Sequence, residues 1–164
     1  MYKYTLRALN VEGMSRVATF FSKWEKLDKI ILIGLVGDLG SGKTHWTREF
    51  FSNFDIDISV PSPTYTLIEP YESLINNRTV YHADIYRLGS SIKSSSYTFN
   101  LCQELGIYDL IRDHKNLILV EWIDLELNLL ENADLLLTFR SGSEEDLRDL
   151  EIKSKFEIIG IANA

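Results

Sequence analysis

Eight consecutive residues carry the strongest chemical signal in this chain. Residues 37–44 read GDLGSGKT and match G-x-x-x-x-G-K-[ST], a pattern typical of phosphate-binding loops. In such a loop the glycines let successive backbone N–H groups face one anion, and the helix that follows adds its positive N-terminal end. Lys43 would contact the β- and γ-phosphates, and the Thr44 hydroxyl would bind Mg²⁺. The sequence therefore predicts a nucleoside triphosphate site built from Gly37, Asp38, Leu39, Gly40, Ser41, Gly42, Lys43 and Thr44.

The segments on either side of this loop support the prediction. Residues 30–36, IILIGLV, are continuously apolar, as in a buried parallel strand. Residues 45–51 contain no glycine or proline and can continue as a helix. A strand, a glycine-rich turn and a helix in this order distinguish a phosphate site from the alternative, an ordinary turn between a strand and a helix.

Hydrolysis of a nucleotide also needs acidic groups that hold the metal and orient the attacking water. Glu121 ends the apolar run 117–120, which places it at the C-terminal edge of a central strand, where open α/β sheets bind ligands. Asp84 ends a second candidate strand at 79–84. The alternatives are a solvated strand end for Glu121, and for Asp84 a turn residue that pairs with Arg87.

Trp122 directly follows Glu121. Alternation along a strand would point these two side chains in opposite directions, so both face the site only if the strand ends there. Trp122 would then stack on a base or gate access, although packing in the core is an equal alternative. The three histidines show no metal-ligand spacing, and His45, on the first turn of the predicted helix, is expected to be solvated.

The rest of the pattern predicts an α/β fold of layered type. Apolar residues at helical spacing predict a helix over 11–27, and a second is expected over 101–111. Further strands are expected at 2–6 (an edge strand), 65–69 and 79–84 (joined by a polar turn at 76–77), 117–120, 133–139 and 150–153. We predict a single P-loop NTPase domain over residues 1–164, with a mixed, mainly parallel central sheet flanked by helices.

Composition narrows the function classes. With 164 residues, 45% of them hydrophobic, the chain has enough apolar content for one sizeable core. Its net charge of −7 makes it a poor candidate for binding nucleic acid on its own, because affinity for nucleic acid comes mainly from lysine and arginine. The lone cysteine, Cys102, excludes an internal disulfide and suits a reducing compartment. No signal peptide or membrane span is visible, so we expect a cytoplasmic protein with no membrane partner.

Four segments, taken in order, resemble the bacterial TsaE (YjeE) ATPases. They are GDLGSGKT at 37–44, SPTYTLIEPY at 62–71, YHADIYRL at 81–88 and LVEW at 119–122, with a weaker match, ELGIYDL, at 104–110. The resemblance implies a P-loop α/β domain that uses ATP and Mg²⁺. It further implies that Asp84 is an essential acid and that Glu121 is the Walker-B-type carboxylate on the metal. Lys43, Glu121 and Asp84 are thus the catalytic candidates, and Thr44, Glu121 and Asp84 the metal ligands.

The resemblance also assigns residues around the nucleotide. Ser62, Pro63 and Thr64 match a nucleotide-responsive switch beside the γ-phosphate, and Trp122 matches a tryptophan near the nucleotide. A late arginine that reaches the phosphates matches Arg148, with Arg140 as a rival, and a nucleotide-contacting hydroxyl matches Ser15. Two departures from the family pattern are the longer stretch between Arg87 and Glu104, and Ile123 where the family tends to have proline.

The implied function is an ATP-hydrolysing accessory subunit in threonylcarbamoyladenosine modification of tRNA next to the anticodon. The implied partners are TsaD, which carries out the transfer, and TsaB, which pairs with TsaD; tRNA is reached only through that complex. With no obvious arginine finger in the chain, we expect weak turnover that partners stimulate. Two alternatives are a small P-loop kinase, disfavoured because the arginines are scattered and the 89–96 loop has none, and a nucleotide-gated binding module without hydrolysis.

Overall fold

The structure is a computed structural model that describes residues 1–54, 67–75, 78–87, 95–144 and 146–163. The predicted switch residues Ser62, Pro63 and Thr64, the turn at 76–77 and most of the 89–96 loop lie outside these ranges. No helix within them combines the length and the apolar character that crossing a bilayer requires.

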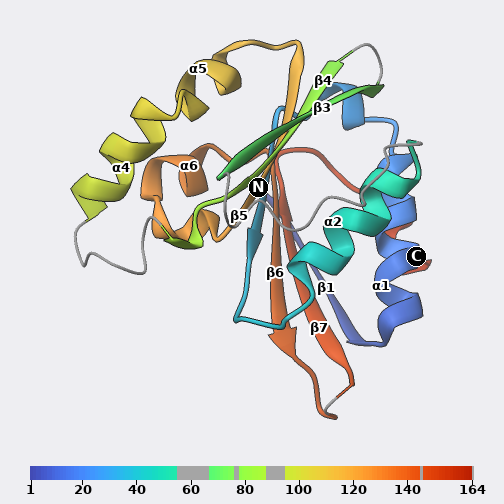
Figure 1. The fold of residues 1–164 in the computed structure, drawn as a ribbon. Coiled ribbons are helices and arrows are strands. Elements are labelled where there is room, and N and C mark those ends of the chain that lie inside the picture. Colours follow the sequence, from blue (N-terminus) through green and yellow to red (C-terminus); the bar gives the residue numbers. More distant parts are fainter. Residues whose placement is uncertain (55–66, 76–77, 88–94, 145, 164) are drawn as a thin grey trace.

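One seven-stranded sheet organises the described residues, with strand order β1-β7-β6-β2-β5-β4-β3 (Figure 1). Its four central strands, β6, β2, β5 and β4, pair in parallel, and β7, β1 and β3 add antiparallel pairs at the two sides. This confirms the predicted mixed sheet with a parallel centre. The strands are β1 Tyr2–Leu9, β2 Leu32–Val36, β3 Ile68–Ile75, β4 Arg78–Asp84, β5 Asn116–Glu121, β6 Leu135–Ser141 and β7 Arg148–Ser154.

Helices cover both faces of the sheet. On one face lie α1 and α2, and on the other lie α4, α5 and α6 (Figure 1). Their bounds are α1 Val11–Ser22, α2 Lys43–Ser52, α4 Ser95–Glu104, α5 Ile107–Arg112 and α6 Leu127–Asn132, with short 3-10 turns at Leu27–Lys29, Ile123–Leu125 and Ile161–Asn163. This layering is the α/β arrangement that the sequence predicts.

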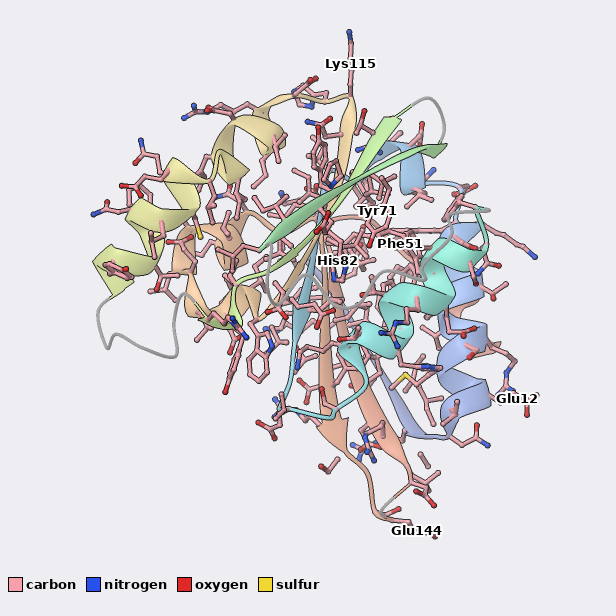
Figure 2. All side chains as sticks on the ribbon, in the orientation of Figure 1. Glu12, Phe51, Tyr71, His82, Lys115 and Glu144 are labelled. Atoms are coloured by element: carbon pink, nitrogen blue, oxygen red, sulfur yellow. The ribbon has the colours of Figure 1, made fainter. Side chains whose placement is uncertain are left out.

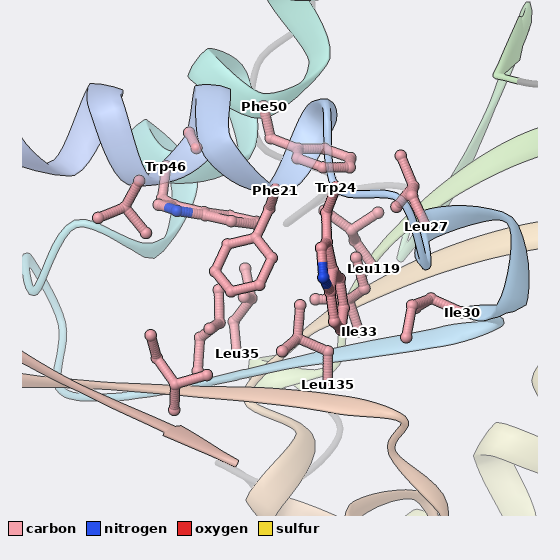
Figure 3. Packing of buried hydrophobic residues seen from close by; sticks show 14 of the residues in the cluster. Phe21, Trp24, Leu27, Ile30, Ile33, Leu35, Trp46, Phe50, Leu119 and Leu135 are labelled. Carbon is pink, nitrogen blue, oxygen red and sulfur yellow. The ribbon is translucent and has the colours of Figure 1, made fainter. Parts of the chain in front are cut away.

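Aromatic side chains fill the layer between the sheet and helices α1 and α2. Trp46 stacks on Phe50 with ring centroids 5.2 Å apart, and Phe21 and Trp24 pack edge to face over the strands (Figure 3). Toward β3 and β4, Phe51 contacts Tyr71, with ring centroids 5.0 Å apart, and His82 lies beside them (Figure 2). The packing fixes α2, and with it the loop at its start, against β2 and β5.

Two helix predictions need correction, and one helix was not predicted. The helix predicted over 11–27 ends at Ser22, and Val11 is exposed instead of lying on the buried stripe. The helix predicted over 101–111 is two helices, because Gly106 takes a left-handed conformation with φ 75° between α4 and α5. Helix α6 was not predicted, since its six residues give too short a window for a periodic signal.

Candidate nucleotide site

The predicted phosphate-binding loop joins the end of β2 at Val36 to the start of α2 at Lys43. Its backbone has positive φ at three glycines, Gly37, Gly40 and Gly42. At Gly37, with φ 149°, a Cβ would come within 2.7 Å of both the Phe139 carbonyl oxygen and Ser41 Oγ. Gly42 is the N-cap of α2 and has φ 106°, a region that other residues rarely adopt. The sequence therefore builds a tight turn whose N–H groups precede a ten-residue helix.

Lys43 is almost fully buried, at 4% exposed, and its ammonium is held by its own loop. Its Nζ donates to the carbonyl oxygens of Gly37 at 2.6 Å and Asp38 at 2.9 Å. The same atom lies 3.8 Å from the centre of the Trp122 ring, a cation–π contact. Burial lowers the pKa of Lys43, while the nearby carboxylates of Glu121 and Asp84 act in the opposite direction.

The two predicted acids lie side by side on neighbouring strands. Asp84 and Glu121 are paired in the parallel register of β4 and β5, and both are buried. Asp84 Oδ1 accepts a hydrogen bond from the Tyr86 N–H at 3.0 Å. Glu121 Oε2 accepts one from the Thr44 hydroxyl, also at 3.0 Å. The contact links the phosphate-binding loop to the carboxylate of a central strand.

Trp122 could face the site only if the strand before it ended at Glu121. Strand β5 ends at Glu121, and Trp122 has a left-handed backbone, with φ 62°, before the next turn. Its ring lies 4.7 Å from the ring of Tyr86, centroid to centroid. Because the strand stops here, the side chains of Glu121 and Trp122 line the same cavity instead of pointing to opposite faces.

Two cavities flank the loop. The smaller, of about 400 Å³, is lined by Lys43, Thr44, Asp84, Glu121 and Trp122 among others. The larger, of about 700 Å³, lies toward α1 and β7 and has Leu9, Asn10, Val11, Met14 and Arg148 in its walls. Both include Gly40, Ser41, Gly42 and His45, so the loop lies between the two cavities. The larger also has Glu12 and Asp146 in its walls, so both compartments carry charged side chains.

A model of the family described as "Threonylcarbamoyl adenosine biosynthesis protein TsaE" matches residues 9–150, most of the chain and all of this site. The chain belongs to the TsaE family. The tRNA threonylcarbamoyladenosine biosynthesis protein TsaE of Haemophilus influenzae is 34% identical over 128 residues, which are 76% of this chain and 71% of that protein. Its namesake in Rickettsia felis is 34% identical over 122 residues, 74% of this chain and 63% of that protein.

A third TsaE, from Bacillus subtilis, is 26% identical over 155 residues, 93% of this chain and 89% of that protein. The crystal structure of Bacillus subtilis YdiB superposes with a TM-score of 0.65 at 22% identity, covering 93% of this chain and 86% of that one. This structural likeness confirms the P-loop fold.

Two buried polar atoms in this TsaE-family chain test whether the loop fits a phosphate chain. Among the described residues, Ser41 Oγ and His45 Nε2 are buried and have no hydrogen-bond partner. A buried polar atom costs free energy unless it is paired, so both atoms suit a ligand rich in acceptor oxygens. The expectation that His45 is solvated was wrong for this nitrogen, and His45 lines both cavities.

The other residues that the resemblance to TsaE proteins assigned to the nucleotide lie in different places. Arg148 lines the larger cavity and donates to the Leu147 carbonyl at 2.8 Å. Its rival Arg140 is exposed and pairs with Glu151 at 2.7 Å, which raises the pKa of Arg140. The Ser15 hydroxyl donates to the Val11 carbonyl at 3.1 Å and is not among the residues lining either cavity. Contacts of these residues with a nucleotide stay predictions.

Among the residues that sequence reasoning missed, one contacts a predicted catalytic acid directly. His82, on β4, is buried, and its Nε2 lies 2.9 Å from Glu121 Oε1. Because a carboxylate only accepts, the contact places the imidazole proton on Nε2. The alternation of β4 gave a usable signal, since His82 is two residues before Asp84 and therefore shares its face of the sheet.

Proposed function

We propose that this chain is an Mg²⁺-dependent ATPase that serves as an accessory subunit in threonylcarbamoyladenosine modification of tRNA. It acts on a complex of TsaB-like and TsaD-like proteins and meets tRNA only through that complex. The observation that carries the proposal is the hydrogen bond from Thr44 in the phosphate-binding loop to the buried Glu121 carboxylate. Membership of the TsaE family supplies the pathway.

The residues of the smaller cavity divide the chemistry among them. Thr44, Glu121 and Asp84 would hold Mg²⁺, which prefers hydroxyl and carboxylate oxygens and neutralises charge on the β- and γ-phosphates when bound. Lys43 would exchange its loop carbonyls for phosphate oxygens. If either Glu121 or Asp84 does not bind the metal directly, that carboxylate can orient the attacking water and accept its proton.

The larger cavity suits the nucleoside. Leu9, Val11 and Met14 give it apolar walls, while Asn10, Glu12, Asp146 and Arg148 add polar and charged groups. Because the loop residues shared by both cavities lie between them, a nucleotide in this orientation would place its phosphates in the smaller cavity, beside Lys43 and Thr44. The TsaE resemblance supports ATP as the nucleotide.

Turnover by the chain alone should be slow. Among the described residues that line the smaller cavity, Lys43 provides the positive charge, against two buried carboxylates. Phosphoryl transfer gains about 10³–10⁵-fold when an arginine is added to stabilise the transition state. We therefore expect a partner protein to raise the rate.

The test is reconstitution with TsaD-like and TsaB-like partners from the same source. We expect ATP hydrolysis to rise on adding both partners, and threonylcarbamoyladenosine formation on tRNA to require this chain. Fast hydrolysis without partners, or modification that proceeds equally well without this chain, would contradict the proposal. Transfer of the γ-phosphate to a small acceptor would instead identify the kinase alternative.

A further inference from the structure

The Glu121 carboxylate is held at both of its oxygens. Oε2 accepts from Thr44 and Oε1 accepts from His82, at 3.0 Å and 2.9 Å. Both side chains of the His82–Glu121 pair are at most 3% exposed. A buried carboxylate is strongly disfavoured unless it is paired, so both hydrogen-bond partners are needed to hold Glu121 in this position.

The position of His82 explains why it reaches Glu121 and not the cavity itself. His82 is opposite Leu119 in the register of β4 and β5, two residues before the Asp84–Glu121 pair. Its ring packs edge to face on Phe51 of α2, with centroids 6.0 Å apart. It is not among the residues that line the smaller cavity, whereas Glu121 and Asp84 are. Helix α2 and β4 therefore fix the imidazole behind the carboxylate.

We infer that His82 is a positioning residue that fixes the Glu121 carboxylate so that Oε2, together with the Thr44 hydroxyl, is presented to a divalent cation. This inference rests on the proposed function, because it concerns how the same site takes up its metal. Outer partners of metal-ligating groups hold the ligand in orientation, and their loss typically weakens metal binding by about 10–100-fold. His82 itself touches neither nucleotide nor metal.

The experiment compares His82→Asn with His82→Gln. The amide nitrogen of glutamine can take the place of Nε2 and still reach Glu121, whereas that of asparagine is too short. Mn²⁺ replaces Mg²⁺, and free Mn²⁺ is measured by electron paramagnetic resonance in the presence of ADP. ADP affinity is measured separately in EDTA, so that metal and nucleotide binding are read independently.

We expect His82→Asn to bind Mn²⁺ about 10-fold more weakly or worse, while ADP affinity in EDTA changes less than about twofold. His82→Gln should regain most of the Mn²⁺ affinity. Val80→Ala is the matched control, since Val80 is buried on the same strand and the same face, two residues before His82. It should destabilise the fold without changing Mn²⁺ affinity.

Equal Mn²⁺ affinity in the asparagine and glutamine variants would overturn the inference, as would an equal loss in Val80→Ala. His82→Leu, which fills the space without a donor, provides a second removal if the asparagine variant does not fold. A wild-type chain that binds neither ADP nor Mn²⁺ with ADP would overturn the proposed function itself. The two failures are therefore distinguishable.

Discussion

The Lys43 ammonium lies 3.8 Å above the Trp122 ring while donating to two carbonyl oxygens of its own loop. One residue begins α2 and the other directly follows β5, so the contact joins two of the elements that line the smaller cavity. A triphosphate that recruits Lys43 would change the surroundings of the indole. The relationship makes Trp122 a reporter of nucleotide binding.

ATP should change the emission of Trp122 even without hydrolysis. Trp24 and Trp46, the other two tryptophans, are buried in the core, so they provide a steady background. Trp122→Phe should remove the fluorescence change, and Trp24→Phe should keep it. A change of the same size in Trp122→Phe would show that the signal comes from elsewhere.

Burial of Lys43 predicts a distinct pH dependence of stability. Its pKa is below the ordinary 10.5, so the folded chain binds this proton less tightly than the unfolded chain does. The resulting destabilisation is complete below the lowered pKa and disappears as pH rises from that pKa to 10.5. The Lys43→Met protein should therefore have a larger free energy of unfolding than wild type at pH 7. The difference between the two proteins should be smaller at pH 10.

Urea unfolding of both proteins at the two pH values measures this effect, because the other titrating groups cancel in the difference between them. An advantage of Lys43→Met that grows with pH would contradict the sign of the shift.

His45→Ala should weaken nucleotide binding by about 10-fold, the cost of losing one hydrogen bond to a charged group. The reason is that His45 Nε2 is buried, unpaired among the described residues, and on the wall of both cavities. Isothermal titration with ADP measures it. His114→Ala is the control, since His114 is exposed in a turn away from the loop. Equal affinities in the two variants would remove His45 from the site.

Cys102 should be inert in the folded protein. It is fully buried, and burial raises its pKa to about 12, so very little thiolate is present at neutral pH. A disulfide reagent such as 5,5′-dithiobis(2-nitrobenzoate) should react at least about 1000-fold more slowly in buffer than in urea, because labelling requires opening of the fold. Rapid labelling without denaturant would show that the side of α4 that carries Cys102 is not packed against the core.

The sequence predicted those parts of the site that depend on local pattern. The glycines of the loop, the apolar run that becomes β5 and the acid at its end are each visible within a few residues, so Lys43, Thr44 and Glu121 were found. The prediction that Trp122 faces the site depended on the strand ending at Glu121. The structure supplied that condition through the left-handed backbone at Trp122.

What escaped prediction depends on contacts between distant segments. His82 acquires its role from the register that brings β4 beside β5, and a histidine within a strand does not reveal its partner. The break at Gly106 was readable in principle, because glycine commonly ends a helix with positive φ. Val11 is exposed because it begins α1 at the wall of the larger cavity, whereas Gly13 and Met14 in the same turn are buried.

The most direct test of the account is Glu121→Gln, with ATP binding and ATP hydrolysis measured on the same protein in Mg²⁺. Glutamine keeps the shape of the side chain and can still contact Thr44 and His82, but it removes the negative charge. We predict ATP affinity within about threefold of wild type, since Lys43 and the loop N–H groups that would hold the phosphates are unchanged. Hydrolysis should fall by at least about 100-fold, alone and with partners. The exposed Glu25→Gln should behave as wild type, whereas wild-type hydrolysis by Glu121→Gln would contradict the central claim.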